Sequence, residues 1–197
     1  MQKLLLVDPN TELCNAWQQA FAHYPEVEII NSRFEQIPNF DCIVSTANSF
    51  GLMDGGVDLA ITRFFGPELQ VRIQNYIIAH YTGEQPVGTS FIIETTHPRH
   101  PYVAHTPTMR VPMPIHATDN VYLAMKALLE AVTAFNALQK RIQVVACPGL
   151  GTATGRMPVE EAARQMALAY RYYLDPPQAI TWSYAAARNR AVIGSTE

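Results

Sequence analysis

Residues 41–61 read DCIVSTANSFGLMDGGVDLAI. The apolar, β-branched start at residues 42–44 is typical of a buried strand. Small and polar residues follow, three glycines lie between Gly51 and Gly56, and from Val57 the apolar residues return at helical spacing. The order is therefore strand, glycine-rich loop, helix. Such a loop leaves backbone N–H groups free at a helix N-terminus, where an anion such as a phosphate binds well.

A second segment repeats this design. Residues 141–147 read as a strand, residues 148–158 as a loop rich in glycine, and residues 159–173 as a helix that tolerates Pro158 in its first turn. Neither loop has the spacing of a dinucleotide fingerprint or of a P-loop. The residues alone therefore predict a site for a phosphate-bearing small molecule, cradled by two strand–loop–helix units.

The two units resemble the signature of macro domains, a family of ADP-ribose-binding modules. That signature has Asn-Ala-Ala-Asn after a strand, then a glycine triplet with Val before a helix. Here the chain has Ser45-Thr-Ala-Asn48 and Asp54-Gly55-Gly56-Val57-Asp58. Its second loop is similar to the turn that wraps the diphosphate. The resemblance implies a three-layer α/β/α sandwich with a mixed central sheet, formed by residues 1–197 as a single macro-like domain. It also implies binding of ADP-ribose or a related NAD-derived nucleotide.

The resemblance assigns roles to individual residues. Asn48 would hydrogen-bond the distal ribose, and Asp58 would orient or activate a water at its anomeric carbon, so these two are the candidate catalytic residues. Each also has a structural interpretation, as a turn residue for Asn48 and as a carboxylate favoured by the helix dipole for Asp58. The predicted ligand-binding residues are Ser32, Phe34, Ala47, Gly55, Gly56, Val57, Pro148, Gly149, Leu150, Gly151, Thr152 and Gly155.

Two positions depart from the family pattern. The family carries Gly-Asp-Ile after an early strand, and its Asp takes the adenine amino group. This chain reads Asn31-Ser32-Arg33-Phe34 there, so Ser32 is a weak replacement and Phe34 is a candidate to stack on a base. Asp54 replaces the first glycine of the triplet, and its carboxylate would repel a diphosphate unless it is turned away or paired. An altered or cyclic ADP-ribose therefore stays open as the ligand.

Composition narrows the function classes. The 197 residues, 48% hydrophobic and 16% charged, describe a globular chain with room for a sizeable core. A net charge of −3 argues against general nucleic-acid binding. Three scattered cysteines imply no disulfide framework, and we expect neither a signal peptide nor a membrane span, so a cytoplasmic setting is the default. His97, His100 and His105 lack the companions of a zinc site, and no metal or cofactor is expected.

Hydrophobic periodicity predicts the remaining elements. We expect strands at residues 3–7, 27–30, 88–94 and 102–105, and helices at 11–23 with Thr11 as the cap, 58–65, 68–81 and from about 120. The end is ambiguous, because residues 180–184 have strand character and residues 185–192 have helical composition.

Three functions stay open at this point. The first is an enzyme that hydrolyses an ADP-ribosyl linkage, with an ADP-ribosylated protein or an O-acetylated ADP-ribose as substrate. The second is a non-catalytic sensor, reader or sequestering protein for a modified or cyclic ADP-ribose signal. The third is a scaffold that has kept the fold and lost the ligand.

Overall fold

A computed structural model describes residues 1–139 and 141–194. In these ranges the chain forms a six-stranded sheet in the order β2-β1-β6-β3-β5-β4. Neighbouring strands are parallel except β4 and β5, which are antiparallel, so the sheet is mixed as predicted. The strands are β1 (Lys3–Val7), β2 (Val27–Ile30), β3 (Cys42–Ser45), β4 (Phe91–Glu94), β5 (Tyr102–His105) and β6 (Val144–Cys147).

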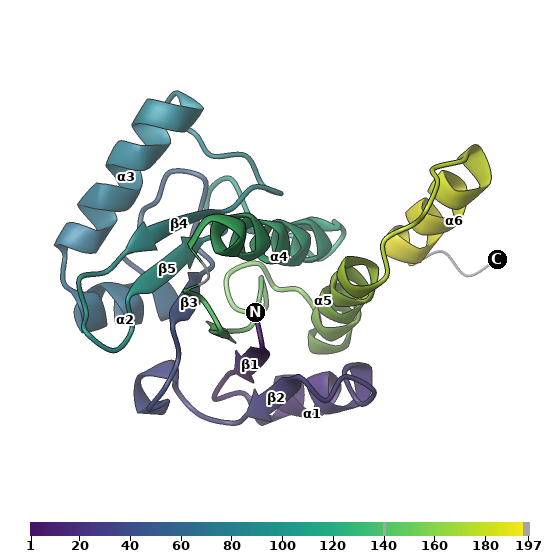
Figure 1. Ribbon diagram of the computed structural model, residues 1–197, viewed down its shortest axis with the longest axis horizontal. Helices are drawn as coiled ribbons and strands as arrows, with labels where there is room; N and C mark the ends of the chain where they lie inside the picture. Colours follow the sequence, from purple (N-terminus) through teal and green to yellow (C-terminus); the bar gives the residue numbers. More distant parts are fainter. Residues whose placement is uncertain (140, 195–197) are drawn as a thin grey trace.

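Helices cover both faces of the sheet, which gives the expected three-layer α/β/α sandwich (Figure 1). Leu4 and Leu6 of β1 face one layer, while Leu5 and Val7 face the other, because successive side chains of a strand point to opposite sides. The first layer consists of α1 (Thr11–Ala20), α4 (Asn120–Gln139) and α5 (Val159–Leu174). The second consists of α2 (Gly56–Phe65), α3 (Glu68–Tyr81) and the short 3-10 turn η1 (Phe34–Gln36).

Several element bounds match the sequence prediction and a few do not. β1, β2, β5 and α3 begin and end where the pattern placed them. β4 begins only at Phe91, because a turn precedes it in which the N–H of Thr89 donates to the carbonyl of Pro86. The cap of α1 is Asn10, whose side chain accepts the first N–H groups of the helix, so the expectation that Thr11 is the cap is wrong.

Helix α4 is apolar enough to raise the question of a membrane span. With 20 residues and a mean hydropathy of 1.4 it meets the criterion of length and composition, contrary to the expectation above. Its apolar side chains pack in the sandwich core, however. The buried ones are Val121, Tyr122, Ala124, Met125, Ala127, Leu128, Leu129 and Val132. Burial among other core residues explains the composition, and we interpret α4 as a core helix.

The chain continues into helix α6 (Trp182–Ile193), so the ambiguous stretch contains a helix rather than a strand. This helix extends beyond α5, at the opposite end of the molecule from α2 and α3 (Figure 1). Val192 is its one buried residue in the described part of the chain. The side chain of Arg188 attaches it to the sandwich by donating to the hydroxyl of Tyr122 at 2.7 and 3.0 Å.

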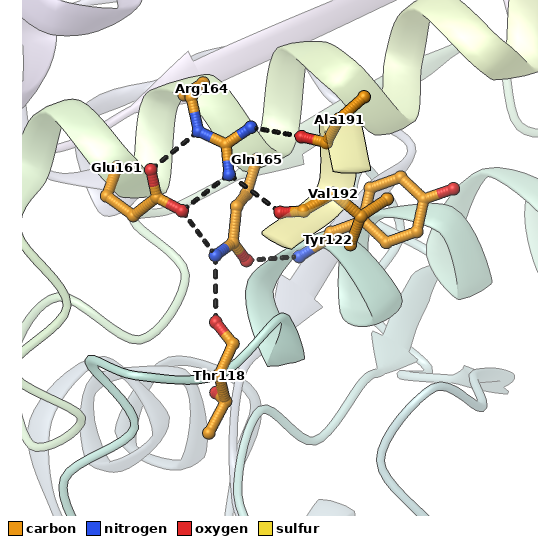
Figure 2. A network of polar contacts seen from close by, with 7 residues as sticks. All are labelled: Thr118, Tyr122, Glu161, Arg164, Gln165, Ala191 and Val192. Carbon is orange, nitrogen blue, oxygen red and sulfur yellow. Dashed lines mark hydrogen bonds and ion pairs between the residues drawn. The ribbon is translucent and has the colours of Figure 1, made fainter. Parts of the chain in front are cut away.

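A second arginine holds the C-terminal end of α6. Arg164 of α5 donates to the carbonyls of Ala191 and Val192, at 2.6 and 2.8 Å, and to the carboxylate of Glu161 (Figure 2). These carbonyls belong to the last turn of α6, where backbone acceptors lack helical partners. The same carboxylate accepts from Gln165, so α6 is connected to a network inside the sandwich.

Candidate functional site

The loops that follow β1, β3, β5 and β6 meet at one edge of the sheet and enclose a cavity of about 470 Å³. These strands are mutually parallel, so their carboxyl ends lie together, where open α/β sheets bind ligands. The volume is in the range of a small-molecule site. Each loop contributes to the wall, through Asp8, Asn48, Met109 and Gly151 in chain order.

The N-terminus of α2 opens onto this cavity. Gly55 is its N-cap, no side chain caps the helix, and Gly55, Gly56, Val57 and Asp58 all line the wall. The N–H groups of a first helical turn have no partner inside the helix. A Cβ placed on Gly55 or Gly56 would meet no atom within 4 Å. Packing therefore does not require glycine at either position, although Gly56 has a φ of 55°, which favours glycine for its backbone. The missing side chains leave room in the cavity itself.

Asn48 lies on the cavity wall, and its side chain orders the loop that follows. Its Nδ2 donates to the carbonyl of Leu52 at 2.9 Å, and its Oδ1 accepts the N–H groups of Phe50 and Leu52 at 3.0 and 3.3 Å. These contacts are those expected of a turn residue, which is the structural interpretation of Asn48. Within residues 1–139 and 141–194 the second Nδ2 hydrogen has no acceptor, and the ribose contact stays a prediction.

Asp58 combines burial with a place on the wall. It is 8% exposed, and its Oδ1 accepts a hydrogen bond of 2.7 Å from Oγ of Ser45. Burial raises the pKa of its carboxyl group to about 7, although hydrogen bonds from Ser45 and from the backbone of Thr46 favour the ionised form. Near neutral pH the group is divided between acid and base forms, which suits proton transfer.

The second glycine loop forms the opposite part of the wall. Pro148, Gly149, Gly151, Thr152 and Gly155 all line the cavity, as predicted. Within the described ranges, no hydrogen-bond partner occupies the N–H groups of residues 151–155, whereas Gly149 donates its N–H to Oδ2 of Asp8 at 3.1 Å. The N–H groups of residues 151–155, rather than that of Gly149, are thus available to an anion.

The glycines of this loop are also required by packing. A Cβ on Gly155 would lie 2.4 Å from the carbonyl oxygen of Gly151, and one on Gly151 would lie 2.6 Å from Cδ1 of Ile115. Gly151 has a φ of 70° as well, a conformation that glycine adopts without strain. For these positions the structural interpretation is sufficient, in contrast to Gly55, while Gly56 shares the positive φ, at 55°.

Other predicted site residues lie in different settings. Ala47 lines the cavity, but Ser32 and Leu150 do not. The hydroxyl of Ser32 donates to Oε1 of Gln36 at 2.6 Å within its own turn, and Leu150 is buried in the core. Phe34 reaches the wall while only 4% exposed, because its ring packs edge-on against Phe64. The structure therefore does not bring Ser32 to the cavity.

The sequence interpretation missed several charged residues of the wall. Asp8, Arg33 and Glu35 line the cavity together with the predicted residues, whereas Asp54, which also lines it, is already expected beside the diphosphate from the sequence. Asp8 directly follows β1, so the rule that ligands bind beyond the carboxyl ends of parallel strands could have included it. Arg33 and Glu35 flank Phe34 and could have been found with it.

Among residues 1–139 and 141–194, no group of three or more His, Cys, Asp and Glu side chains is arranged to hold a metal ion. His100 stacks on Phe40, with ring centroids 3.9 Å apart. His105 is buried against Gln85, and burial lowers its pKa to about 3. The contacts of both histidines are therefore those of packed structural residues.

Comparison with known proteins identifies the family to which the chain belongs. Residues 44–166 match the family "Macro domain". An uncharacterized protein of Aquifex aeolicus is 31% identical over 141 residues, which are 72% of this chain and 78% of that protein.

Solved macrodomain structures share the fold. The Oceanobacillus iheyensis macrodomain with ADP superposes with a TM-score of 0.58 at 21% identity, over 78% of this chain and 83% of that one. The Trypanosoma brucei macrodomain in complex with ADP-ribose gives a TM-score of 0.55 at 20% identity, over 88% of this chain and 58% of that one.

Proposed function

The chain belongs to the macro domain family, and from this premise we propose that its cavity binds ADP-ribose or a related NAD-derived nucleotide. One observation supports the proposal most strongly. Two sets of residues line the same cavity, at the start of α2 and at 151–155, and their backbone N–H groups have no partner in the described chain. A diphosphate presents two neighbouring anionic groups, which such N–H groups accept from two sides.

Other residues of the wall are placed where they could contact the ribose and the base of such a nucleotide. Asn48 and Asp58 stand beside the first loop, where a distal ribose would lie. Arg33 and Phe34 form another part of the wall and would face the base end. Solved relatives that hold ADP or ADP-ribose support this class of ligand.

The acidic residues of the wall bear on affinity. Both carboxylate oxygens of Asp8 accept backbone N–H groups, from Asn10 and Gly149, which offsets part of its charge. Asp54 is exposed and can turn toward solvent. Attraction between the diphosphate and the free N–H groups of the two loops therefore has to exceed the remaining repulsion from these carboxylates. We expect the affinity for ADP-ribose to fall less with rising salt than it would at a lysine-lined site.

Isothermal titration calorimetry tests the proposal. ADP-ribose and ADP should both give saturable binding with one site per chain, while AMP should bind at least about tenfold more weakly, since it lacks the second phosphate that the two loops share. Cyclic ADP-ribose belongs in the same series as the alternative ligand. Absence of saturable heat with every one of these nucleotides would refute the proposed function and favour a scaffold without ligand.

Hydrolysis of an ADP-ribosyl linkage is a second candidate, and Asp58 favours it. Its base form would take a proton from a water, and the oxygen of that water would bond to the anomeric carbon. The bond from this carbon to the attached group would break, and the leaving atom would be protonated. A carboxyl group with a pKa of about 7 provides both forms at neutral pH. The candidate substrate for this step is an ADP-ribosylated protein. O-acetylated ADP-ribose is the other candidate, and there the water would bond to the acetyl carbonyl carbon while the bond from that carbon to the ribose oxygen breaks.

Turnover assays separate the enzyme from a reader or sensor. If the chain is a hydrolase, it should release ADP-ribose from one of these substrates, and Asp58→Asn should lower kcat by about a hundredfold or more with little change in binding. Tight binding of ADP-ribose without any turnover would instead support a non-catalytic reader.

A further inference from the structure

Asp58 is held by a neighbour that the family resemblance does not assign to the site. Oγ of Ser45 lies 2.7 Å from Oδ1 of Asp58, a distance typical of a hydroxyl that donates to a carboxylate. Ser45 is the last residue of β3 and is completely buried, so its hydroxyl contacts Asp58 from behind the cavity wall. From this geometry we infer that Ser45 is a positioning residue, which fixes the orientation and the charge state of Asp58 toward the bound nucleotide.

The backbone of Ser45 has little freedom to move. It pairs in register with His105 of β5, and its carbonyl accepts the N–H of Thr106 at 2.9 Å. β3 also lies between β5 and β6 in the middle of the sheet. Because the strand is anchored on both sides, the position of the hydroxyl is set by a single rotamer.

The first turn of α2 supplies the other half of the contact. Asp58 sits at the third position of the helix, and the end of β3 and the residue after it supply two donors, the hydroxyl of Ser45 and the backbone of Thr46. Both donors favour the ionised carboxylate, whereas burial favours the neutral acid. Loss of the hydroxyl would therefore leave a buried carboxyl group with fewer donors and a stronger preference for its proton.

Other ionisable groups share the cavity wall with Asp58 or lie beside Ser45 in the sheet. On the cavity side these are Asp8, Arg33, Glu35 and Asp54, and on the sheet side the neighbour of Ser45 is His105. Burial lowers the pKa of His105 to about 3, so it stays neutral while Asp58 titrates. A change at Ser45 alters none of these groups directly, which makes the titration of Asp58 a specific readout.

The inference rests on the proposed function only in that Asp58 faces the nucleotide, and the titration itself needs no ligand. The carboxyl ¹³C signal of Asp58, assigned by comparison with Asp58→Asn, can be followed against pH in the ligand-free protein. In Ser45→Ala the midpoint should move up by about one to two pH units, as expected for the loss of one hydrogen bond to a charged group. Ser45→Thr, which keeps a hydroxyl, should bring the midpoint back toward that of the unmodified protein.

Ser49→Ala is the matched control. Ser49 is also buried, at 1% exposure, in the same connection, but its hydroxyl contacts the carbonyl of Met109 instead of Asp58. Its removal should leave the midpoint unchanged. Should Ser45→Ala fail to fold, Ser45→Cys retains the volume with a weaker donor and should also raise the midpoint.

An unshifted midpoint in a folded Ser45 variant without the hydroxyl, or an equal shift in Ser49→Ala, would overturn the inference. Calorimetry with ADP-ribose on the same samples tests the proposed function separately. A shifted midpoint with no ligand binding would leave Ser45 as the residue that positions Asp58 and would refute the nucleotide site.

Discussion

Oδ2 of Asp8 accepts the backbone N–H of Gly149 at 3.1 Å, while its Oδ1 accepts the N–H of Asn10 at 2.9 Å. One carboxylate thus ties the end of β1 to the glycine loop that follows β6. These segments are 141 positions apart in the chain and both line the cavity. The shape of the second loop therefore depends on a residue outside the glycine motif.

Removal of this bridge should destabilise the protein. We expect Asp8→Ala to lower the free energy of unfolding by about 1–2 kcal/mol, since two hydrogen bonds to a partly buried charged acceptor are lost. Asp8→Asn retains one acceptor oxygen and should lose roughly half as much. Urea denaturation followed by circular dichroism measures both. If Asp8→Ala unfolds at the same urea concentration as the unmodified protein, the bridge contributes nothing to stability.

The two glycine loops should respond differently to alanine. Gly55 has an extended backbone (φ −141°, ψ 160°) and open space around its Cα, so Gly55→Ala should cost no more than about 1 kcal/mol of stability. A ligand that approaches this backbone would meet the new methyl group, and affinity for ADP-ribose should fall about tenfold or more.

Gly155→Ala is the counterpart of this variant. Its Cβ would collide with the carbonyl oxygen of Gly151, so we expect a loss of about 2 kcal/mol or more of stability. Thermal unfolding and calorimetry on both variants give the comparison. Undiminished ADP-ribose binding by Gly55→Ala would mean that the nucleotide does not contact the start of α2.

The sequence predicted the elements that local pattern determines. The helix at Glu68–Tyr81 and the strand at Tyr102–His105 were located to the residue, because both have clear apolar patterns between strong turn signals. Both glycine loops were located as well, and most of their predicted residues line one cavity. Local patterns define segments, and the parallel order of β1, β6 and β3 brings the ends of these segments together.

What the sequence could not provide depended on contacts between distant segments. The bond from Gly149 to Asp8 and the hydrogen bond between Ser45 and Asp58 join residues whose spacing in the chain suggests no interaction. The adenine-site role given to Ser32 relied on alignment with a motif, and the structure turns its hydroxyl toward Gln36. Side-chain direction at such positions follows from the tertiary fold.

Stability should depend on pH through Asp58. The pKa of its carboxyl group is raised from 3.8 to about 7 by burial, so between these values the folded state holds a proton that the unfolded state has released. The stabilisation that this proton gives the folded state is fully present below about pH 4 and is lost as the pH rises through 7. It contributes as much as about 4 kcal/mol to the free energy of unfolding.

The variant Asp58→Asn tests the direction of this change of stability with pH. Denaturant unfolding between pH 5 and about pH 8.5 should show the unmodified protein losing stability relative to Asp58→Asn as the pH rises, since Asn carries no proton to lose. Parallel curves for the two proteins across this interval would show that Asp58 does not titrate within it.

Docking of α6 should depend on Arg164. This side chain donates to the last carbonyls of α6, at Ala191 and Val192, while Glu161 holds the guanidinium from the other side (Figure 2). In Arg164→Ala these carbonyls lose their donors, and the helix, which buries only Val192 in the described chain, has little other apolar contact. Hydrogen exchange in residues 182–193 should accelerate about tenfold or more, while exchange in the central sheet stays unchanged.

Lys126→Ala is the matched control for this last experiment. Lys126 forms an exposed ion pair with Glu130 along α4, and among the described residues no hydrogen bond or ion pair joins it to α6. Its removal should leave exchange in α6 at the unmodified rate, because an isolated surface pair contributes little. Equal exchange of α6 in Arg164→Ala and the unmodified protein would show that the contact of Arg188 with Tyr122 holds the helix without help from Arg164.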